Sequence, residues 1–277
     1  MRSENLGTPS VNLSKQATME VKSLLGKAGI VTGAGTGIGR AIAIRLSELG
    51  ADVGVNYHLS EEGARKTQAE INTRGRTAVL LQCDVSKAEP VRHMVEKAQS
   101  ELGRLDFLVN NATGSHVKTD HSVEASVIDD WLEEINVDLT GAFLCTHFVS
   151  PLMLAAKAGR IVNISSICGV TGDCGPAYCS AKAGLLGLTR SCAASLAPYI
   201  QVNALLPGFV SSQQHDVERV SRITPGKKMG TPEDIAELTG HLISMKGTFL
   251  TGSCIVVDGG ITNGIIGLSM NWLNQRG

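Results

Sequence analysis

Residues 27–50 of the chain read KAGIVTGAGTGIGRAIAIRLSELG and join a short apolar run, a glycine-rich turn and a longer stretch with helical periodicity. The apolar run predicts a buried β-strand, and the periodic stretch predicts a helix that begins directly at the turn. Glycines permit a tight turn and a close approach of the backbone to a ligand, and a helix N-terminus presents N–H groups and a positive dipole to phosphate. This strand–turn–helix unit therefore predicts a site for the pyrophosphate of a dinucleotide.

The spacing of the glycines narrows this interpretation. The pattern G-x-G-x-x-G, counted from Gly33, fails because Ile38 occupies its last position. The pattern T-G-x-x-x-G-x-G, counted from Thr32, fits. A merely flexible turn is the alternative, but the position between the first strand and the first helix of a βαβ series favours a binding loop.

The same alternation of apolar runs and helical stretches continues to residue 260. Strand-like runs occur at 27–33, 51–57, 77–85, 105–112, 159–166, 200–208 and 253–260, and most are separated by helical stretches of ten to twenty residues. Continuous apolar strands that alternate with helices are typical of a parallel sheet covered on both faces. We predict one α/β domain over residues 26–262, a doubly wound Rossmann-type fold with about seven parallel strands, between an N-terminal arm (1–25) and a C-terminal tail (263–277).

Composition excludes several classes of function. The net charge of −1 and the lack of a basic stripe give no support for binding nucleic acid or an anionic membrane, and no run of about 18 apolar residues predicts a membrane span. The seven cysteines form an odd number without a C-x-x-C pair, which favours reduced thiols and a cytoplasmic location, with Cys168, Cys174 and Cys179 as small packing residues. The histidines are scattered without metal-ligand spacing, so we predict no metal site.

The stretch 165–182, SSICGVTGDCGPAYCSAK, contains a candidate catalytic pair. Tyr178 and Lys182 are four residues apart, so in a helix the phenol and the ammonium share one face. A fixed cation beside a phenol favours the phenolate, which suits general acid–base catalysis. The alternative for this pair by itself is a half-buried tyrosine beside a solvated lysine.

Taken together, these motifs resemble the short-chain dehydrogenase/reductase family over about residues 26 to 260. The resemblance rests on ordered motifs: TGAGTGIG at 32–39, CDV at 83–85, NNA at 110–112, Asn136 within INVDLTGAF, NISS at 163–166, the Tyr178/Lys182 pair, PG at 207–208 and VDGG at 257–260. One departure is Thr113, where the family commonly has glycine after NNA. The resemblance implies an enzyme that moves a hydride between a nicotinamide cofactor and a carbonyl carbon.

The resemblance also implies roles for individual residues. Tyr178 would transfer the proton, Lys182 would stabilise the phenolate, Ser166 would hold the substrate oxygen and Asn136 would hold a water linked to Lys182. Ser166 is preferred to Ser165 because it has the S-x-x-G relation to Gly169. The cofactor would contact Gly33, Thr36, Gly37, Ile38, Gly39, Tyr57, His58, Asp84, Val85, Asn110, Ala112, Tyr178, Lys182, Pro207, Gly208 and Val210.

The second predicted strand indicates which cofactor is used. An NAD site usually has an acidic residue at the end of this strand, whereas here the strand ends in Asn56, Tyr57 and His58. With no carboxylate to repel a 2′-phosphate, we expect NADP(H) rather than NAD(H), with His58, Ser60 and Arg40 as candidate phosphate contacts.

The substrate is less well defined by the sequence. We expect a small-molecule or carrier-tethered carbonyl substrate. The segment after Gly208 is shorter than in typical family members, which predicts an open site that accepts a bulky or carrier-tethered compound. The general resemblance is to 3-oxoacyl-carrier-protein reductases and glucose-dehydrogenase-like members. The alternatives are an NAD(P)-dependent alcohol or sugar dehydrogenase working oxidatively, or a dinucleotide-binding sensor without turnover. The family usually assembles through two long helices, which correspond here to about 124–157 and 176–197, so the resemblance implies a homotetramer or a homodimer.

Overall fold

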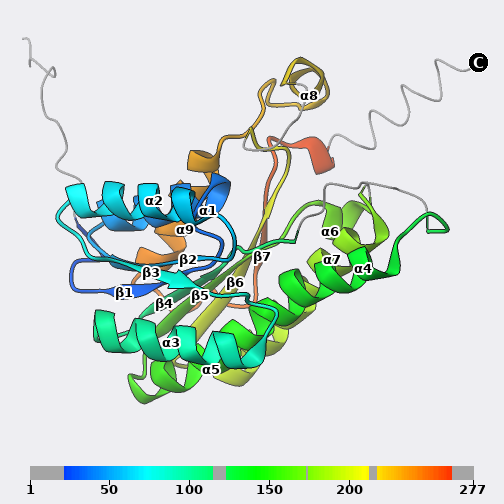
Figure 1. Cartoon of the computed structure of the whole chain (residues 1–277). Helices are drawn as coiled ribbons and strands as arrows, with labels where there is room; N and C mark the ends of the chain where they lie inside the picture. The colour runs from blue at the N-terminus through cyan, green and yellow to red at the C-terminus, as the bar shows by residue number, and fades with distance from the viewer. Residues whose placement is uncertain (1–21, 115–122, 173, 212–216, 264–277) are drawn as a thin grey trace, which may run out of the picture.

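The computed structural model describes residues 22–114, 123–172, 174–211 and 217–263. Seven parallel strands form one sheet in the order β3-β2-β1-β4-β5-β6-β7 (Figure 1). The strands are β1 (Ala28–Val31), β2 (Asp52–Tyr57), β3 (Ala78–Gln82), β4 (Phe107–Asn110), β5 (Gly159–Ile164), β6 (Ile200–Pro207) and β7 (Cys254–Val257). This order is the doubly wound arrangement, and the predicted parallel sheet of about seven strands is confirmed.

Helices cover both faces of the sheet (Figure 1). One layer contains α1 (Gly37–Glu48), α2 (Glu61–Thr73) and α9 (Pro232–Ser244), and the other contains α3 (Ala88–Leu102), α5 (Gly141–Ala155) and α7 (Pro176–Leu196). A hydrophobic cluster fills the space between the sheet and each helix layer. One cluster contains Ile42 and Ile235, and the other contains Val91 and Val149. The strands are therefore buried on both sides, which accounts for their continuous apolar runs.

The segment between β4 and β5 forms one continuous helical run. It consists of α4 (Ile128–Glu134), the π-helix η1 (Ile135–Thr140) and α5. Its length and apolar composition would also suit a membrane-crossing helix. Here it is a core helix, because Cys145, Val149 and Met153 of α5 pack in the cluster against the sheet.

The position of the site follows from the strand order. The order reverses where β1 lies beside β4, and a parallel sheet leaves a crevice at the carboxyl ends of the strands at such a point. The backbone N–H of Thr32, just after β1, donates to the carbonyl of Val109 in β4 at 3.0 Å, which ties the two strand ends together. The loops that follow β1 and β4 are thereby brought to one edge.

The predicted arm and tail are only partly described. Leu24 is buried in the core, and its N–H donates to the carbonyl of Leu49 at 2.8 Å. The last residues of the predicted arm thus pack on the domain. Residues 1–21 and 264–277 lie outside the described residues.

Candidate active site

The glycine-rich loop after β1 is built for close backbone packing. Gly33 and Gly37 have φ angles of +62° and +54°, a backbone conformation that residues with a Cβ atom rarely adopt. A Cβ atom on Gly39 would lie 2.3 Å from the carbonyl oxygen of Gly33, so any side chain there would displace the loop. The first turn of α1 contains no acidic residue, and its N-terminus is suited to a pyrophosphate.

Asn56 at the end of β2 supports this loop from one side. Its Oδ1 accepts from the N–H of Gly33 at 3.1 Å, while its Nδ2 donates to the carbonyls of Leu81 at 3.0 Å and Cys83 at 3.2 Å. The side chain is buried, with 1% of the residue exposed. Asn56 therefore acts as a brace for the loop, a role that the sequence did not reveal.

The loop after β4 supports the glycine loop from the other side. The hydroxyl of Thr32 accepts from the N–H groups of Asn111 at 2.8 Å and Ala112 at 3.0 Å. The side chain of Asn111 donates back to the carbonyl of Thr32 at 2.9 Å. Ala112, a predicted cofactor contact, thus lies directly beside Gly33, where a Cβ atom would be 3.0 Å from the Ala112 Cα.

The side chain of Asn110, a predicted cofactor contact, binds other side chains of the fold through its amide nitrogen. It is buried, and its Nδ2 donates to Thr146 Oγ1 at 3.2 Å and to Asn163 Oδ1 at 2.8 Å. Asn163 in turn donates to Thr189 Oγ1 at 2.9 Å. This polar chain links β4 and β5 to α5 and α7, so the amide nitrogen of Asn110 braces the sheet.

The ends of β2 and β3 form the predicted adenosine side of the site. The exposed His58 lies close enough to Asp84 for its charge to act on the carboxyl group. Burial alone would raise the pKa of Asp84, but hydrogen bonds from Ser86 hold it below its usual value. Next to Asp84, Val85 is buried in the core.

Charges near this edge are already paired. Glu61 forms an ion pair with Arg65 at 2.6 Å, and Glu62 forms one with Lys66 at 2.7 Å. Arg40, a predicted phosphate contact, is held by Glu70 at 3.0 Å. The carboxylates of Glu61 and Glu62 therefore repel a 2′-phosphate less than unpaired carboxylates would. Arg40 already pairs with Glu70, so its guanidinium is not free to bind that phosphate alone.

The two serines after β5 have separate environments. Ser165 is buried, and its Oγ donates to the carbonyl of Lys182 at 2.8 Å. The Oγ of Ser166 instead accepts from the N–H of Cys168 at 3.1 Å, an arrangement that keeps its own proton available for a substrate oxygen. This difference supports the choice of Ser166 over Ser165.

Tyr178 and Lys182 lie on α7, which begins at Pro176, and the Ser166 turn packs against α7. The Nζ of Lys182 is 5.3 Å from the centre of the Tyr178 ring and donates to the carbonyl of Ile164 at 3.2 Å. A Cβ atom on Gly169 would lie 2.8 Å from the carbonyl carbon of Lys182, so the Ser166 turn rests on this part of α7. The predicted serine, tyrosine and lysine are brought to one edge of the sheet.

The prediction for Asn136 is wrong in this structure. Asn136 is exposed, whereas Asp138, two residues further along η1, is buried and places Oδ2 2.7 Å from the Nζ of Lys182. Asp138 Oδ2 also accepts from the hydroxyl of Thr113 at 2.9 Å, and Oδ1 accepts from the N–H of Gly114 at 2.8 Å. Two residues along a helix turn a side chain to nearly the opposite face, so the residue beside Lys182 is an aspartate rather than an asparagine.

These contacts shift the ionisation of the buried groups. Burial alone would lower the pKa of Lys182, but the negative charge of Asp138 raises it above its usual value. Burial raises the pKa of Glu134, one turn before Asp138, to about 7, and the charge of Asp138 adds to this shift. Lys182 is thus held as an ammonium at neutral pH.

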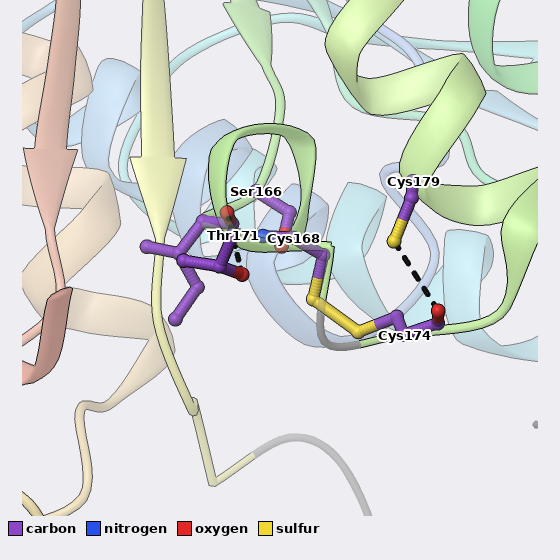
Figure 2. The surroundings of a disulfide bond; sticks show 6 residues. Ser166, Cys168, Thr171, Cys174 and Cys179 are labelled. Carbon is purple, nitrogen blue, oxygen red and sulfur yellow. Dashed lines mark hydrogen bonds between the residues drawn. A yellow bond between two sulfur atoms is a disulfide. The ribbon is translucent and has the colours of Figure 1, made fainter. Parts of the chain in front are cut away.

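The β5–α7 connection contains a disulfide bond (Figure 2). Cys168 is bonded to Cys174, six residues further on, and Cys179 donates from Sγ to the carbonyl of Cys174 at 3.3 Å. The expectation that all seven cysteines are free thiols is therefore wrong for Cys168 and Cys174. The bond spans part of the segment between Ser166 and Tyr178.

The end of β6 is tied to the turn after Ser166 and to β7. The carbonyl of Pro207 accepts from the N–H of Ile167 at 3.1 Å, and the N–H of Gly208 donates to Val257 at 3.0 Å. Val210 is buried and pairs with Gly230. The helix α8 (Val217–Ile223) lies further along the chain, and residues 212–216 of the short segment after Gly208 lie outside the described residues.

The whole arrangement fits a nicotinamide dinucleotide. The glycine loop lies at the switch point before the N-terminus of α1, and the ammonium, phenol and serine hydroxyl gather at the same edge of the sheet. Fold and site together define a nucleotide-dependent oxidoreductase of the doubly wound class.

Comparison with known proteins identifies the family. The model of the short chain dehydrogenase family matches residues 27–221, and the chain belongs to this family of nicotinamide-dependent oxidoreductases. The chain is 38% identical over 243 residues to the 3-oxoacyl-(acyl-carrier-protein) reductase FabG of Staphylococcus aureus, covering 85% of this chain and 98% of that protein. It is 37% identical over 245 residues to the 3-oxoacyl-(acyl-carrier-protein) reductase of a Synechocystis species, covering 86% and 98%.

A solved structure gives a second comparison. The acetoin dehydrogenase YohF of Salmonella typhimurium superimposes with a TM-score of 0.78 at 33% identity, covering 86% of this chain and 98% of that one. The family resemblance and the enzymatic class predicted from the sequence are thereby confirmed.

Proposed function

We propose that the protein is an NADP(H)-dependent reductase that converts a ketone, with a 3-oxoacyl thioester as the first candidate, to a secondary alcohol. The observation that carries this proposal is the buried Lys182 beside Tyr178, together with the serine hydroxyl of Ser166. A binding protein without turnover would have no need to bury a lysine charge at this position, because burying a charge is costly unless it is paired.

The chain supplies the groups for proton transfer and charge stabilisation. When bound, the nicotinamide cofactor supplies the hydride. Tyr178 donates its phenolic proton to the substrate oxygen, and Ser166 donates a hydrogen bond to the same oxygen. Lys182 stabilises the phenolate that remains on Tyr178, and Asp138 holds the Lys182 ammonium in place.

The preference for NADP(H) is supported by the charges near the end of β2. Neither Tyr57 nor His58 carries a carboxylate, and Glu61 and Glu62 at the start of α2 are each neutralised one turn later. The N-terminus of α2 lies against the glycine loop, because a Cβ on Gly63 would be 2.5 Å from the Gly35 carbonyl oxygen. A 2′-phosphate near this N-terminus is favoured by the helix dipole.

A second candidate is the oxidation of a small secondary alcohol. It is favoured by the fit to the acetoin dehydrogenases of Salmonella typhimurium and Enterobacter cloacae, the latter with a TM-score of 0.78 at 35% identity. The same Tyr178 would act as a base in this direction. Initial rates with a 3-oxoacyl thioester and with acetoin, measured in both directions, distinguish the two candidates.

We propose that the protein assembles as a homotetramer or homodimer and is cytoplasmic. Phe143 and Leu154 on α5 and Leu132 on α4 are large apolar side chains with more than a third of their surface exposed, which suits a homodimer or homotetramer interface on this helical run. Sedimentation analysis tests this assembly. The cytoplasmic location is tested by fractionation, with thiol labelling to report the state of Cys168 and Cys174 in the cell.

The proposed function is tested with wild type and Tyr178→Phe. Both are expected to bind NADPH with similar affinity, because the phenyl ring is retained, whereas turnover of ketones falls by about 10²–10⁴-fold in the variant. Equal turnover in the two proteins would contradict the proposed role of Tyr178. Binding without turnover of any ketone or alcohol by wild type would favour a sensor.

A further inference from the structure

The residue that follows the NNA motif reaches the buried ion pair of the candidate site. Thr113 donates from its hydroxyl to Oδ2 of Asp138 at 2.9 Å, and the same oxygen lies 2.7 Å from the Nζ atom of Lys182. Thr113 is exposed, whereas Asp138 and Lys182 have exposed fractions of 2% and 3%. An exposed residue thus directs its hydroxyl at a buried pair of charges.

The backbone that carries Thr113 is held on both sides. Before it, the N–H of Ala112 donates to the hydroxyl of Thr32, just after β1, at 3.0 Å. After it, the N–H of Gly114 donates to Oδ1 of Asp138 at 2.8 Å. The place of the Thr113 hydroxyl is therefore set by bonds to β1 on one side and to η1 on the other.

The orientation of the Asp138 carboxylate depends on its donors. The torsion that rotates a carboxylate about its bond to Cβ has a broad energy minimum, so this torsion alone does not fix the plane of the group. The Gly114 N–H binds Oδ1 and the Thr113 hydroxyl binds Oδ2. One donor from the same loop on each oxygen fixes the plane, whatever the position of the lysine.

The position of the Lys182 ammonium depends on its acceptors in turn. A lysine ammonium is a compact charge on a flexible four-carbon stem. Its Nζ donates to the carbonyl of Ile164 at 3.2 Å, contacts Asp138 Oδ2 and lies 5.3 Å from the centre of the Tyr178 ring. The attraction between an ammonium and a phenolate weakens with distance. A carboxylate of fixed orientation therefore keeps the ammonium where it supports the phenolate.

Anchoring of the loop is the simpler role for the Thr113 hydroxyl. The backbone N–H groups of Ala112 and Gly114 already tie this loop to β1 and η1. The hydroxyl adds a bond to Oδ2, which is the oxygen that contacts Lys182. At a position where the family commonly has glycine, this chain thus has a donor to the ion pair.

We propose that Thr113 is a positioning residue, whose hydroxyl fixes the Asp138 carboxylate in the orientation that holds the Lys182 ammonium beside Tyr178. This inference rests on the proposed reductase function for its effect on turnover, whereas the coupling between Thr113 and Asp138 is independent of that function. No catalytic contact is assigned to Thr113, because it acts through Asp138 and Lys182.

The first experiment compares two substitutions of Thr113. Thr113→Val nearly keeps the shape of the side chain and removes the hydroxyl, whereas Thr113→Ser keeps the hydroxyl. We expect kcat for NADPH-driven ketone reduction to fall by about tenfold in Thr113→Val, which loses a hydrogen bond to a charged group, and to stay within about twofold of wild type in Thr113→Ser. Thr73→Val, which removes an exposed hydroxyl bond on α2, is the matched control and keeps the wild-type kcat. An unchanged kcat in Thr113→Val, or an equal loss in Thr113→Ser, would overturn the proposal.

The second experiment tests whether Thr113 acts through Asp138. The effect of Thr113→Val on kcat is measured again in the Asp138→Asn background. Hydrogen bonds to an ionised acceptor are about twice as strong as those to a neutral one, so we expect the tenfold loss to shrink to about threefold. An undiminished loss in this background would show that Thr113 acts independently of Asp138, contrary to the proposal.

Urea denaturation of the same four cofactor-free proteins separates this inference from the proposed function. We expect Thr113→Val to raise the unfolding equilibrium constant more in the wild-type background than in Asp138→Asn. Absence of turnover by wild type on every ketone and alcohol would reject the reductase function, while the urea series would still decide whether the two residues are coupled. Coupling in urea with an unchanged kcat in Thr113→Val would retain the contact and reject its influence on catalysis.

Discussion

The Oδ2 atom of Asp138 lies 2.7 Å from the Nζ atom of Lys182, and neither side chain is more than 4% exposed. The pair joins the π-helix η1 to α7, the two elements that flank the Tyr178 side of the site. Removing one member of a buried pair leaves the other charge uncompensated, which is more costly than losing an exposed ion pair.

Asp138→Asn is expected to lower both stability and activity. The buried ammonium of Lys182 loses its counter-charge, so the free energy of unfolding falls by on the order of 3 kcal/mol. Turnover falls by at least about tenfold, because the lysine is no longer held as a cation beside Tyr178. Urea denaturation and initial-rate kinetics measure the two effects. Asp129→Asn, which changes an exposed carboxylate on α4, is the matched control and leaves both values near wild type.

Substitution of Ser166 is expected to lower mainly catalysis, and substitution of Ser165 is expected to lower mainly stability. Ser166→Ala removes a donor to the substrate oxygen and lowers kcat by about 10²–10³-fold with little effect on folding. Ser165→Ala removes a buried hydrogen bond to the Lys182 carbonyl and costs about 1 kcal/mol of stability. Thermal unfolding and kcat are compared for the two variants, and a larger loss of kcat in Ser165→Ala would reverse the assignment.

A carboxylate at the end of β2 is expected to change the cofactor preference. His58→Asp places a negative charge where the 2′-phosphate of NADPH is proposed to lie, and the position is exposed, so the substitution leaves the core of the fold unchanged. The KM for NADPH is expected to rise by about tenfold or more, with a small change for NADH. His58→Asn is the neutral control. An equal effect on both cofactors would contradict the proposed phosphate position.

The stability of the protein is expected to fall as pH rises towards neutrality. The pKa of Glu134 is raised from 4.5 to about 7 by burial and by Asp138, so the folded state binds this proton more tightly than the unfolded state. The contribution is fully present below pH 4.5 and is lost as pH rises through about 7, an effect on the order of 3 kcal/mol. Urea denaturation at pH 5 and pH 8 measures it.

Glu134→Gln is expected to remove this pH dependence. Its unfolding free energy exceeds that of wild type at pH 8, because the amide cannot ionise, and the difference narrows at pH 5. Glu133→Gln keeps the wild-type slope. The difference in unfolding free energy between Glu134→Gln and wild type is the measured quantity. If this difference is the same at pH 5 and pH 8, the raised pKa of Glu134 is refuted.

Much of the fold could be predicted from local sequence patterns. The apolar runs of β1 and β2 are buried on both faces, so they are continuous rather than alternating, and the positive φ angles of Gly33 and Gly37 explain the glycines between β1 and α1. The Tyr178/Lys182 pair was predictable for a similar reason, because a regular helix places residues four apart on one face.

The long-range parts of the site could not be predicted in this way. Asn136 and Asp138 lie in a π-helical segment, and the sequence does not show which of them turns towards α7. The partners of Asn56 and Thr113 are 23 and 25 residues away along the chain, and side-chain hydrogen bonds of that range depend on the packed fold. The one local signal was the unusual Thr113, whose hydroxyl binds Asp138.

The bond between Cys168 and Cys174 also makes the site chemically addressable (Figure 2). Treatment with a dithiol converts it to two thiols on the segment that joins Ser166 to Tyr178, with Cys179 as a third thiol next to the tyrosine. A thiol-selective electrophile would then attach within the catalytic segment of the reduced protein, while the oxidised protein offers it Cys179 alone in this segment. Covalent probes aimed at this cysteine trio would thus distinguish two chemical forms of one enzyme.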